Sequence, residues 1–249
     1  MTAGAPPPIL EAVDVGYCYP GGTPTQALEG LSLEIADGEF VALLGPVGCG
    51  KTTLLRIFAG FLQPAKGRVR CSGASIDGPG WQRGYVLQEE AIFPWMTVRQ
   101  NVEFGLLAKG LEPDDRGKVS DELLELIGLT AFADAYPREL STGMSKMVEV
   151  VRVLATDPSI LLLDEPFGAL DAQTRQRMQD ALAQLWAQAV VGSGPCGPCK
   201  PVASQIRRLR ARNSPEKRVS NDRGRGMSTT RVAFTRPGRG ERTSTRSAR

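Results

Sequence analysis

The sequence lacks any long apolar segment: no stretch approaches the roughly 18 consecutive apolar residues that a membrane-spanning helix requires. The first twenty residues also lack the positive charge followed by an apolar run that marks a signal peptide. Five cysteines among 249 residues form an odd and scattered set, unlike the framework of a disulfide-rich secreted domain. These absences predict reduced thiols and a protein that stays in the cytoplasm.

The composition excludes collagen, coiled coils and full-length disorder, but it changes along the chain. Hydrophobic residues make up 41% and charged residues 23% of the sequence, as in one globular unit or two small ones. Residues 1–189 carry 15 Lys and Arg against 24 Asp and Glu, whereas residues 190–249 carry 15 against 3. Only nine of the last sixty residues are Val, Ile, Leu, Met or Phe, too few to offset the ordering entropy. We expect a folded body over residues 1–189 and a basic, disordered tail over residues 190–249.

Strands and helices are predicted to alternate in the body. Alternating or continuous apolar runs predict strands at 31–35, 40–44 and 160–163. Apolar stripes at helical spacing predict helices at 53–61, 98–109, 116–127, 144–154 and 171–189. This alternation indicates an α/β domain with a small helical layer between two sheet segments.

A phosphate-binding loop is predicted at Gly45–Thr52, which reads GPVGCGKT and satisfies the pattern G-x-x-x-x-G-K-[ST]. It lies directly between the predicted strand 40–44 and the predicted helix 53–61. Glycines let successive backbone N–H groups turn inward on phosphates, and the helix N-terminus adds partial positive charge. We expect Lys51 to reach the β- and γ-phosphates and Thr52 to offer its hydroxyl to Mg²⁺.

Two acidic residues, Asp164 and Glu165, follow the apolar strand 160–163. Beside the phosphate loop, Asp164 would hold Mg²⁺ and Glu165 would polarise the attacking water. A general base of this type contributes about 10²- to 10⁴-fold to a rate. Taken alone, such a pair is explained equally well as a surface feature, so the assignment depends on the loop at Lys51.

Together these motifs resemble the ATP-binding subunits of ABC transporters. The resemblance runs in order and spacing through residues 9–189 and rests on Gly45–Thr52, Gln88, Leu140–Met144, Leu161–Pro166 and Gly168–Asp171. The run from Gln88 to Val98, followed by Asn101 and Val102, is similar to the nitrate, sulfonate and taurine importer branch. The resemblance implies a P-loop NTPase (RecA-like) core, an antiparallel β subdomain and an inserted α-helical signature subdomain at about residues 89–155.

The resemblance also implies ATP hydrolysis with Mg²⁺ and assigns roles to individual residues. Glu165 and Gln88 would be catalytic, and Thr52, Gln88 and Asp164 would hold Mg²⁺. The nucleotide would contact Tyr19, Gly45, Gly48, Cys49, Gly50, Lys51, Thr52, Thr53, Ser141 and Gly143. Tyr19, with Tyr17 as the alternative, would stack its ring under the adenine, although a core or loop tyrosine is an equally simple explanation.

The segment Leu140–Met144, which matches the signature of the family, can also be explained by the physical chemistry of its residues. Ser141 stands where it can cap the apolar-striped segment 144–154, and its hydroxyl would meet the γ-phosphate of a nucleotide held by a partner subunit. Gly143 permits close approach, but Thr142 stands where the family usually has glycine. Lys146 and Met147 stand where Gln-Arg is common. An ordinary capped core helix remains the alternative.

The partners implied are a second ATPase subunit in a homodimer, transmembrane permease subunits and, indirectly, a solute-binding protein. Gln88 would couple the Mg²⁺ site to the permease, and the dimer would lie peripherally at the cytoplasmic face of the membrane.

No nucleic acid is expected as a partner of the basic tail, because the thirteen arginines from Arg207 to Arg249 have only Phe234 as an interleaved aromatic. The CGPC sequence at 196–199 resembles a redox motif, but no strand precedes it.

One departure from the family is large. Past the predicted helix 171–189 the family continues into a strand that ends in a histidine contacting the γ-phosphate, and this chain has no histidine. Losing one such donor costs about 10²- to 10³-fold in rate. The abrupt change to a basic tail suggests a change of reading frame.

Two alternatives to a working importer subunit follow. The first is a catalytically impaired nucleotide-binding remnant. The second is a soluble ABC-type ATPase of repair or translation, although those chains tend to carry a long insertion or a second cassette, and positions 88 and 140 are only 52 apart here.

Overall fold

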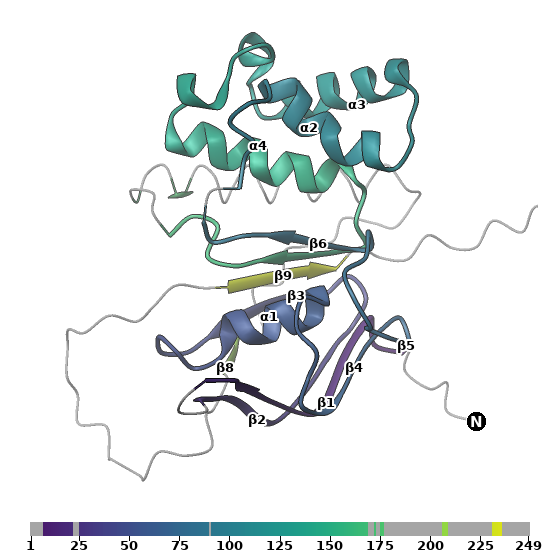
Figure 1. Ribbon diagram of the computed structural model, residues 1–249, viewed down its shortest axis with the longest axis vertical. Helices are drawn as coiled ribbons and strands as arrows, with labels where there is room; N and C mark the ends of the chain where they lie inside the picture. Colours follow the sequence, from purple (N-terminus) through teal and green to yellow (C-terminus); the bar gives the residue numbers. More distant parts are fainter. Residues whose placement is uncertain are drawn as a thin grey trace, which may run out of the picture.

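The computed structural model describes residues 7–21, 25–89 and 91–168, residues 172, 175 and 176, and the backbone of 206–208 and 231–235. The elements in chain order are β1 (Leu10–Tyr19), β2 (Thr25–Ile35), β3 (Phe40–Leu44), α1 (Lys51–Ala59), β4 (Lys66–Cys71), β5 (Ala74–Ser75), β6 (Arg83–Val86), α2 (Val98–Ala108), α3 (Pro113–Leu126), η1 (Thr130–Phe132), η2 (Pro137–Glu139), α4 (Thr142–Ala155), β7 (Ile160–Leu163), β8 (Ile206–Arg208) and β9 (Arg231–Thr235). Figure 1 shows the helices α2, α3 and α4 on one side of a central sheet, with α1 and the strands β1, β2, β4 and β5 on the other.

The smaller sheet confirms the predicted antiparallel β subdomain. Its strand order is β2-β1-β4-β5, and every neighbouring pair is antiparallel. The apolar face of β1, with Leu10, Ala12 and Val15 buried, packs into the main hydrophobic core. The predicted strand 31–35 is the second half of β2, which begins at Thr25.

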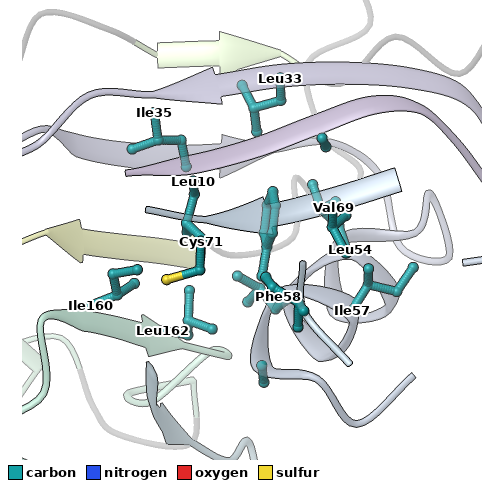
Figure 2. Packing of buried hydrophobic residues seen from close by; sticks show 14 of the residues in the cluster. Leu10, Leu33, Ile35, Leu54, Ile57, Phe58, Val69, Cys71, Ile160 and Leu162 are labelled. Carbon is teal, nitrogen blue, oxygen red and sulfur yellow. The ribbon is translucent and has the colours of Figure 1, made fainter. Parts of the chain in front are cut away.

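Helix α1 joins this sheet to the central sheet. Its side chains Leu54, Ile57 and Phe58 are buried, and Figure 2 shows them in one cluster with residues of the antiparallel strands and with Ile160 and Leu162 of β7. Burying each such side chain contributes about 1.5–3 kcal/mol. This packing fixes α1, and with it the loop that precedes it, against the end of the central sheet.

The central sheet carries the two strands whose bounds the sequence predicts to the residue, β3 and β7. Its strand order is β6-β7-β9-β3-β8. Strands β6 and β7 are parallel, with Val86 opposite Leu163, so their carboxyl ends lie at the same edge. Residues that follow these two strands, including Gln88 and Asp164, are therefore brought together.

Two segments of the basic tail differ from the expectation of a wholly disordered tail. The backbone of β9 pairs antiparallel with both β7 and β3, and β8 pairs parallel with β3. The physical reason is that β3 and β7 are apolar interior strands whose backbone N–H and C=O groups need hydrogen-bonding partners. Composition alone could not reveal this, because backbone pairing requires no apolar side chains.

The helical layer confirms the predicted inserted subdomain. Helices α2, α3 and α4 share a hydrophobic core that includes Val98, Val102, Leu124, Val148 and Val151. The predicted helix 116–127 begins earlier, at Pro113, because proline is well accommodated in the first turn of a helix.

The predicted helix 171–189 falls largely outside the described residues, within which positions 172, 175 and 176 are helical. Asp171 and the CGPC sequence also lie outside them. In the described part of the chain, no helix is long and apolar enough to cross a membrane.

Candidate functional site: a phosphate loop beside two acidic strand ends

The loop between β3 and α1 has the backbone shape that a phosphate cradle requires. Gly48 and Gly50 adopt φ values of 78° and 91°, in the left-handed region that disfavours other residues. A Cβ on Gly50 would lie 2.5 Å from the Ala27 carbonyl oxygen, whereas a Cβ on Gly48 would meet open space. Gly50 is thus required by packing, and Gly48 leaves room above the loop.

Lys51 is buried inside this loop, with 3% of its surface exposed. Its ammonium Nζ donates to the carbonyl oxygens of Gly45 at 2.7 Å and Pro46 at 2.8 Å, and it lies 3.6 Å from Cys49 Sγ. These contacts hold a positive charge at the N-terminal end of α1, where the helix dipole also favours an anion.

Asp164 meets the loop from the end of β7. It is 1% exposed, and Thr52 Oγ1 donates to its Oδ1 at 3.5 Å. Tyr85 of β6, which sequence reasoning missed, donates its hydroxyl to Asp164 Oδ2 at 3.0 Å. Burial, followed by the Asp164 carboxylate, raises the pKa of Tyr85, so this hydroxyl keeps its proton and remains a donor. Both carboxylate oxygens are therefore oriented.

Gln88 and Glu165 also meet, as their placement after adjacent strands implies. Gln88 Nε2 donates to Glu165 Oε2 at 3.4 Å. Glu165 has a φ of 51°, which costs a residue other than glycine about 1–3 kcal/mol. Strain of this kind persists only where the surrounding structure enforces it. Here one restraint is the hydrogen bond from the N–H of Gly168 to the carbonyl oxygen of Glu165, at 3.1 Å.

The donor set fits Mg²⁺ held jointly with phosphate oxygens. Within the described ranges no group of three or more His, Cys, Asp and Glu side chains could hold a metal ion by itself. Thr52, Asp164 and Gln88 offer a hydroxyl, a carboxylate and an amide, all oxygen ligands. Mg²⁺ typically takes one or two such protein ligands together with substrate phosphates and water.

Tyr19 lies at the rim of the loop through its hydroxyl, which shares a hydrogen bond of 3.1 Å with Thr53 Oγ1. Its ring meets Tyr17 edge-on, with the centroids 4.9 Å apart. Tyr17 also packs against the main core, whereas Tyr19 ends β1. Of the two candidates, Tyr19 is the one joined to the loop helix.

Ser141 caps α4 as expected, its side chain accepting from the N–H of Met144 at 3.3 Å. Gly143 is buried in the first turn of α4, and Thr142 is exposed beside it. These residues belong to the helical layer, on a different element from the phosphate loop.

An aromatic cluster follows Gln88, in which Trp95 and Phe104 are exposed and Phe93 is half-buried. Trp95, 70% exposed, stacks on Phe93 with centroids 5.5 Å apart, and Phe93 meets Phe104 edge-on at 4.8 Å. The buried Asn101 fixes this turn, because its side chain accepts from the Phe93 N–H and donates to the carbonyls of Phe93, Met96 and Thr97. We call Phe93, Trp95 and Phe104 the aromatic surface.

Comparisons with known sequences agree with this geometry. Residues 28–168 match the family model described as ABC transporter. The chain is 52% identical over 162 residues to an ATP-binding protein of Brucella abortus, covering 65% of this chain and 62% of that relative. The chain thus spans less than two thirds of that protein's length.

Two relatives have names that state a solute. The taurine import ATP-binding protein TauB of Ruegeria pomeroyi is 45% identical over 179 residues, covering 72% of this chain and 67% of the relative. The nitrate import ATP-binding protein NrtD of a Synechocystis species is 46% identical over 178 residues, covering 71% and 67%.

A solved structure with the same architecture is the dimeric post-hydrolysis state of an ATP-binding cassette bound to ADP and Pi. It is similar with a TM-score of 0.64 and 30% sequence identity, covering 71% of this chain and 82% of that chain.

Proposed function

Because this chain belongs to the ABC transporter family, we propose that it binds and hydrolyses ATP with Mg²⁺ as the ATP-binding subunit of an importer for a small solute. The observation that carries the proposal is that Thr52, next to the buried Lys51, bonds to Asp164, while Glu165, the following residue, bonds to Gln88 at the same edge of the central sheet. The names of the taurine and nitrate relatives support the solute class.

Each group at this edge has a distinct task. Lys51 and the backbone N–H groups around Gly48 and Gly50 bind the phosphates. Thr52, Asp164 and Gln88 would hold Mg²⁺, which when bound neutralises charge on the phosphate oxygens. Glu165 orients the attacking water and accepts its proton at the carboxylate. The Gln88 amide holds that carboxylate through Oε2.

The partners follow from two exposed features. Ser141 at the start of α4 would face the nucleotide of a second subunit, as in a dimer that encloses two ATP molecules. The aromatic surface, with Trp95 70% exposed and Phe104 41% exposed, would dock a transmembrane permease subunit at the cytoplasmic face of the membrane. A solute-binding protein would act through that permease.

A second candidate is a nucleotide-binding chain that does not turn over. It is favoured by the absence of histidine from the whole sequence and by Thr142 at the start of α4.

Phosphate release separates the two. The purified chain is incubated with Mg-ATP, with EDTA as the control, and nucleotide binding is titrated in parallel. Release that depends on Mg²⁺ supports the importer ATPase, whereas binding without release supports the second candidate.

A further inference from the structure

A buried ion pair lies outside the phosphate site, on the face of α4 that meets the segment after β6. Lys146 is 8% exposed and Glu149 is 1% exposed. Lys146 Nζ lies 3.0 Å from Glu149 Oε2, one helical turn along α4. Placing both charges out of water is costly unless their hydrogen bonds are satisfied. The geometry shows which groups satisfy them.

The partners of Lys146 are backbone carbonyls of the segment that follows β6, residues 87–91, which we call the Gln88 segment. Its ammonium donates to Leu87 O at 2.7 Å and lies 3.5 Å from Gln88 O and 3.4 Å from Glu89 O. Three N–H donors thus serve four acceptors, three of them consecutive carbonyls. The Glu149 carboxylate in turn accepts from the backbone of Ala91. The lysine therefore binds the beginning of this short segment, at residues 87–89, and the glutamate binds its end, at Ala91.

The next turn of α4 extends this contact. The Arg152 guanidinium lies 4.7 Å from the centre of the Phe93 ring, within the range of a cation–π interaction. Moving the segment off α4 would leave the ammonium of Lys146 and the carboxylate of Glu149 paired with each other but without their backbone partners. The segment and α4 are consequently joined as one body, with Ser141 at one end of that helix and the aromatic surface beside it.

We propose that Lys146 is a positioning residue for ATP hydrolysis: by holding the carbonyls of Leu87, Gln88 and Glu89 to α4, it sets the Gln88 amide against the Glu165 carboxylate. This inference rests on the proposed function. It also gives a physical role to a lysine that stands where the family commonly has glutamine.

The test compares three variants. Lys146→Met removes the donors and keeps most of the length of the side chain. Lys146→Met with Glu149→Gln also removes the carboxylate charge that would be left unpaired. Lys109→Met is the matched control, because Lys109 also donates to a backbone carbonyl of the helical layer, that of Thr156, away from the Gln88 segment.

Two readouts are measured on each variant. The first is kcat for phosphate release alongside Mg-ATP affinity. We expect both Lys146 variants to lose about 10- to 100-fold in kcat while affinity stays within about twofold, since small misplacements of a supporting group have effects of this size. The double variant should recover stability but not kcat. If Lys146 had only a structural role, kcat would recover together with stability.

The second readout is hydrogen exchange at the amides of Gln88, Glu89 and Ala91 without nucleotide. Lys146→Met should speed this exchange, and Lys109→Met should not. Unchanged exchange overturns the proposal whether or not the chain hydrolyses ATP, and so does an unchanged kcat. If the wild-type chain releases no phosphate but the exchange rises as expected, the proposed function fails while the attachment of the segment to α4 stands.

Discussion

In the described part of the chain two lysines are buried, Lys51 and Lys146, and both bond to backbone carbonyls, but at very different sequence separations. The carbonyl partners of Lys51 lie five and six positions away, within one loop. Those of Lys146 lie 57 to 59 positions away, across the boundary between the central sheet and the helical layer. The first arrangement lies within a local sequence pattern, and we propose that it binds phosphates. The second exists only in the folded chain and joins two parts of it.

The largest effect is expected at the phosphate-loop side of this comparison. Glu165→Gln should lower phosphate release by about 10²- to 10⁴-fold, because the amide cannot accept the proton of water. Mg-ATP affinity, measured by calorimetric titration, should be retained. Glu122→Gln, an exposed position on α3, is the control and should leave the rate unchanged. Equal rates for Glu165→Gln and wild type would remove Glu165 from the chemistry.

At the α4 side, Glu149→Met should cost about 3–5 kcal/mol of unfolding free energy at neutral pH, because it leaves the Lys146 ammonium buried without its carboxylate. Burial raises the pKa of Glu149 in the folded state despite the attraction of Lys146. A glutamate whose pKa is higher in the folded than in the unfolded protein binds its proton more tightly when folded. It therefore contributes stability that is fully present below the unfolded pKa and is lost as the pH rises through the folded pKa.

The stability difference between wild type and Glu149→Met should therefore widen as pH falls from about 8 toward about 5, a range chosen to approach the ordinary glutamate pKa. Urea unfolding at several pH values measures it. A difference that narrows on acidification would contradict the assigned direction of the Glu149 shift.

A smaller effect on stability is expected from the hydrogen bond between Tyr85 and Asp164, which lies within the candidate site. Tyr85→Phe removes the donor to Asp164 Oδ2 and keeps the ring against Phe61. A hydrogen bond to a charged group contributes about 1.5–3 kcal/mol, so the unfolding free energy should fall by that amount. Tyr17→Phe, on β1, is the comparison. A loss equal to that of Tyr17→Phe would show that the Asp164 contact adds nothing.

The smallest effect is expected at the cap of α4. Ser141→Ala removes the acceptor for the Met144 N–H and should cost about 0.5–2 kcal/mol in chemical unfolding. Thr97→Ala, which removes the corresponding cap of α2, should cost a similar amount. No measurable change for Ser141→Ala alone would mean that water replaces the serine hydroxyl at this helix start.

The sequence predicts well the features that depend on neighbouring residues. Strands 40–44 and 160–163 are found at the predicted bounds, because each is a short apolar run bounded by polar or glycine residues. The glycine-lysine loop is likewise a local pattern. Gln88 and Glu165, by contrast, are placed in one site by the family resemblance alone, and they meet because β6 and β7 end at one edge of a parallel pair.

The features that sequence reasoning missed depend on distant pairing. Tyr85 lies 79 positions from Asp164, and nothing in the alternation of β6 distinguishes it from a core tyrosine. Lys146 stood out only as a departure from the residue common in the family. The tail strands β8 and β9 were missed because a basic composition says nothing about which backbone edges of β3 and β7 require partners.

The phosphate site is tested most directly by a calorimetric titration of wild type and Lys51→Ala with Mg-ATP, with thermal unfolding as the check that both chains are folded. We expect saturable binding by wild type and none by the variant, because Lys51 carries the positive charge inside the loop. Equal affinities in two folded chains would contradict the assignment of the phosphate site.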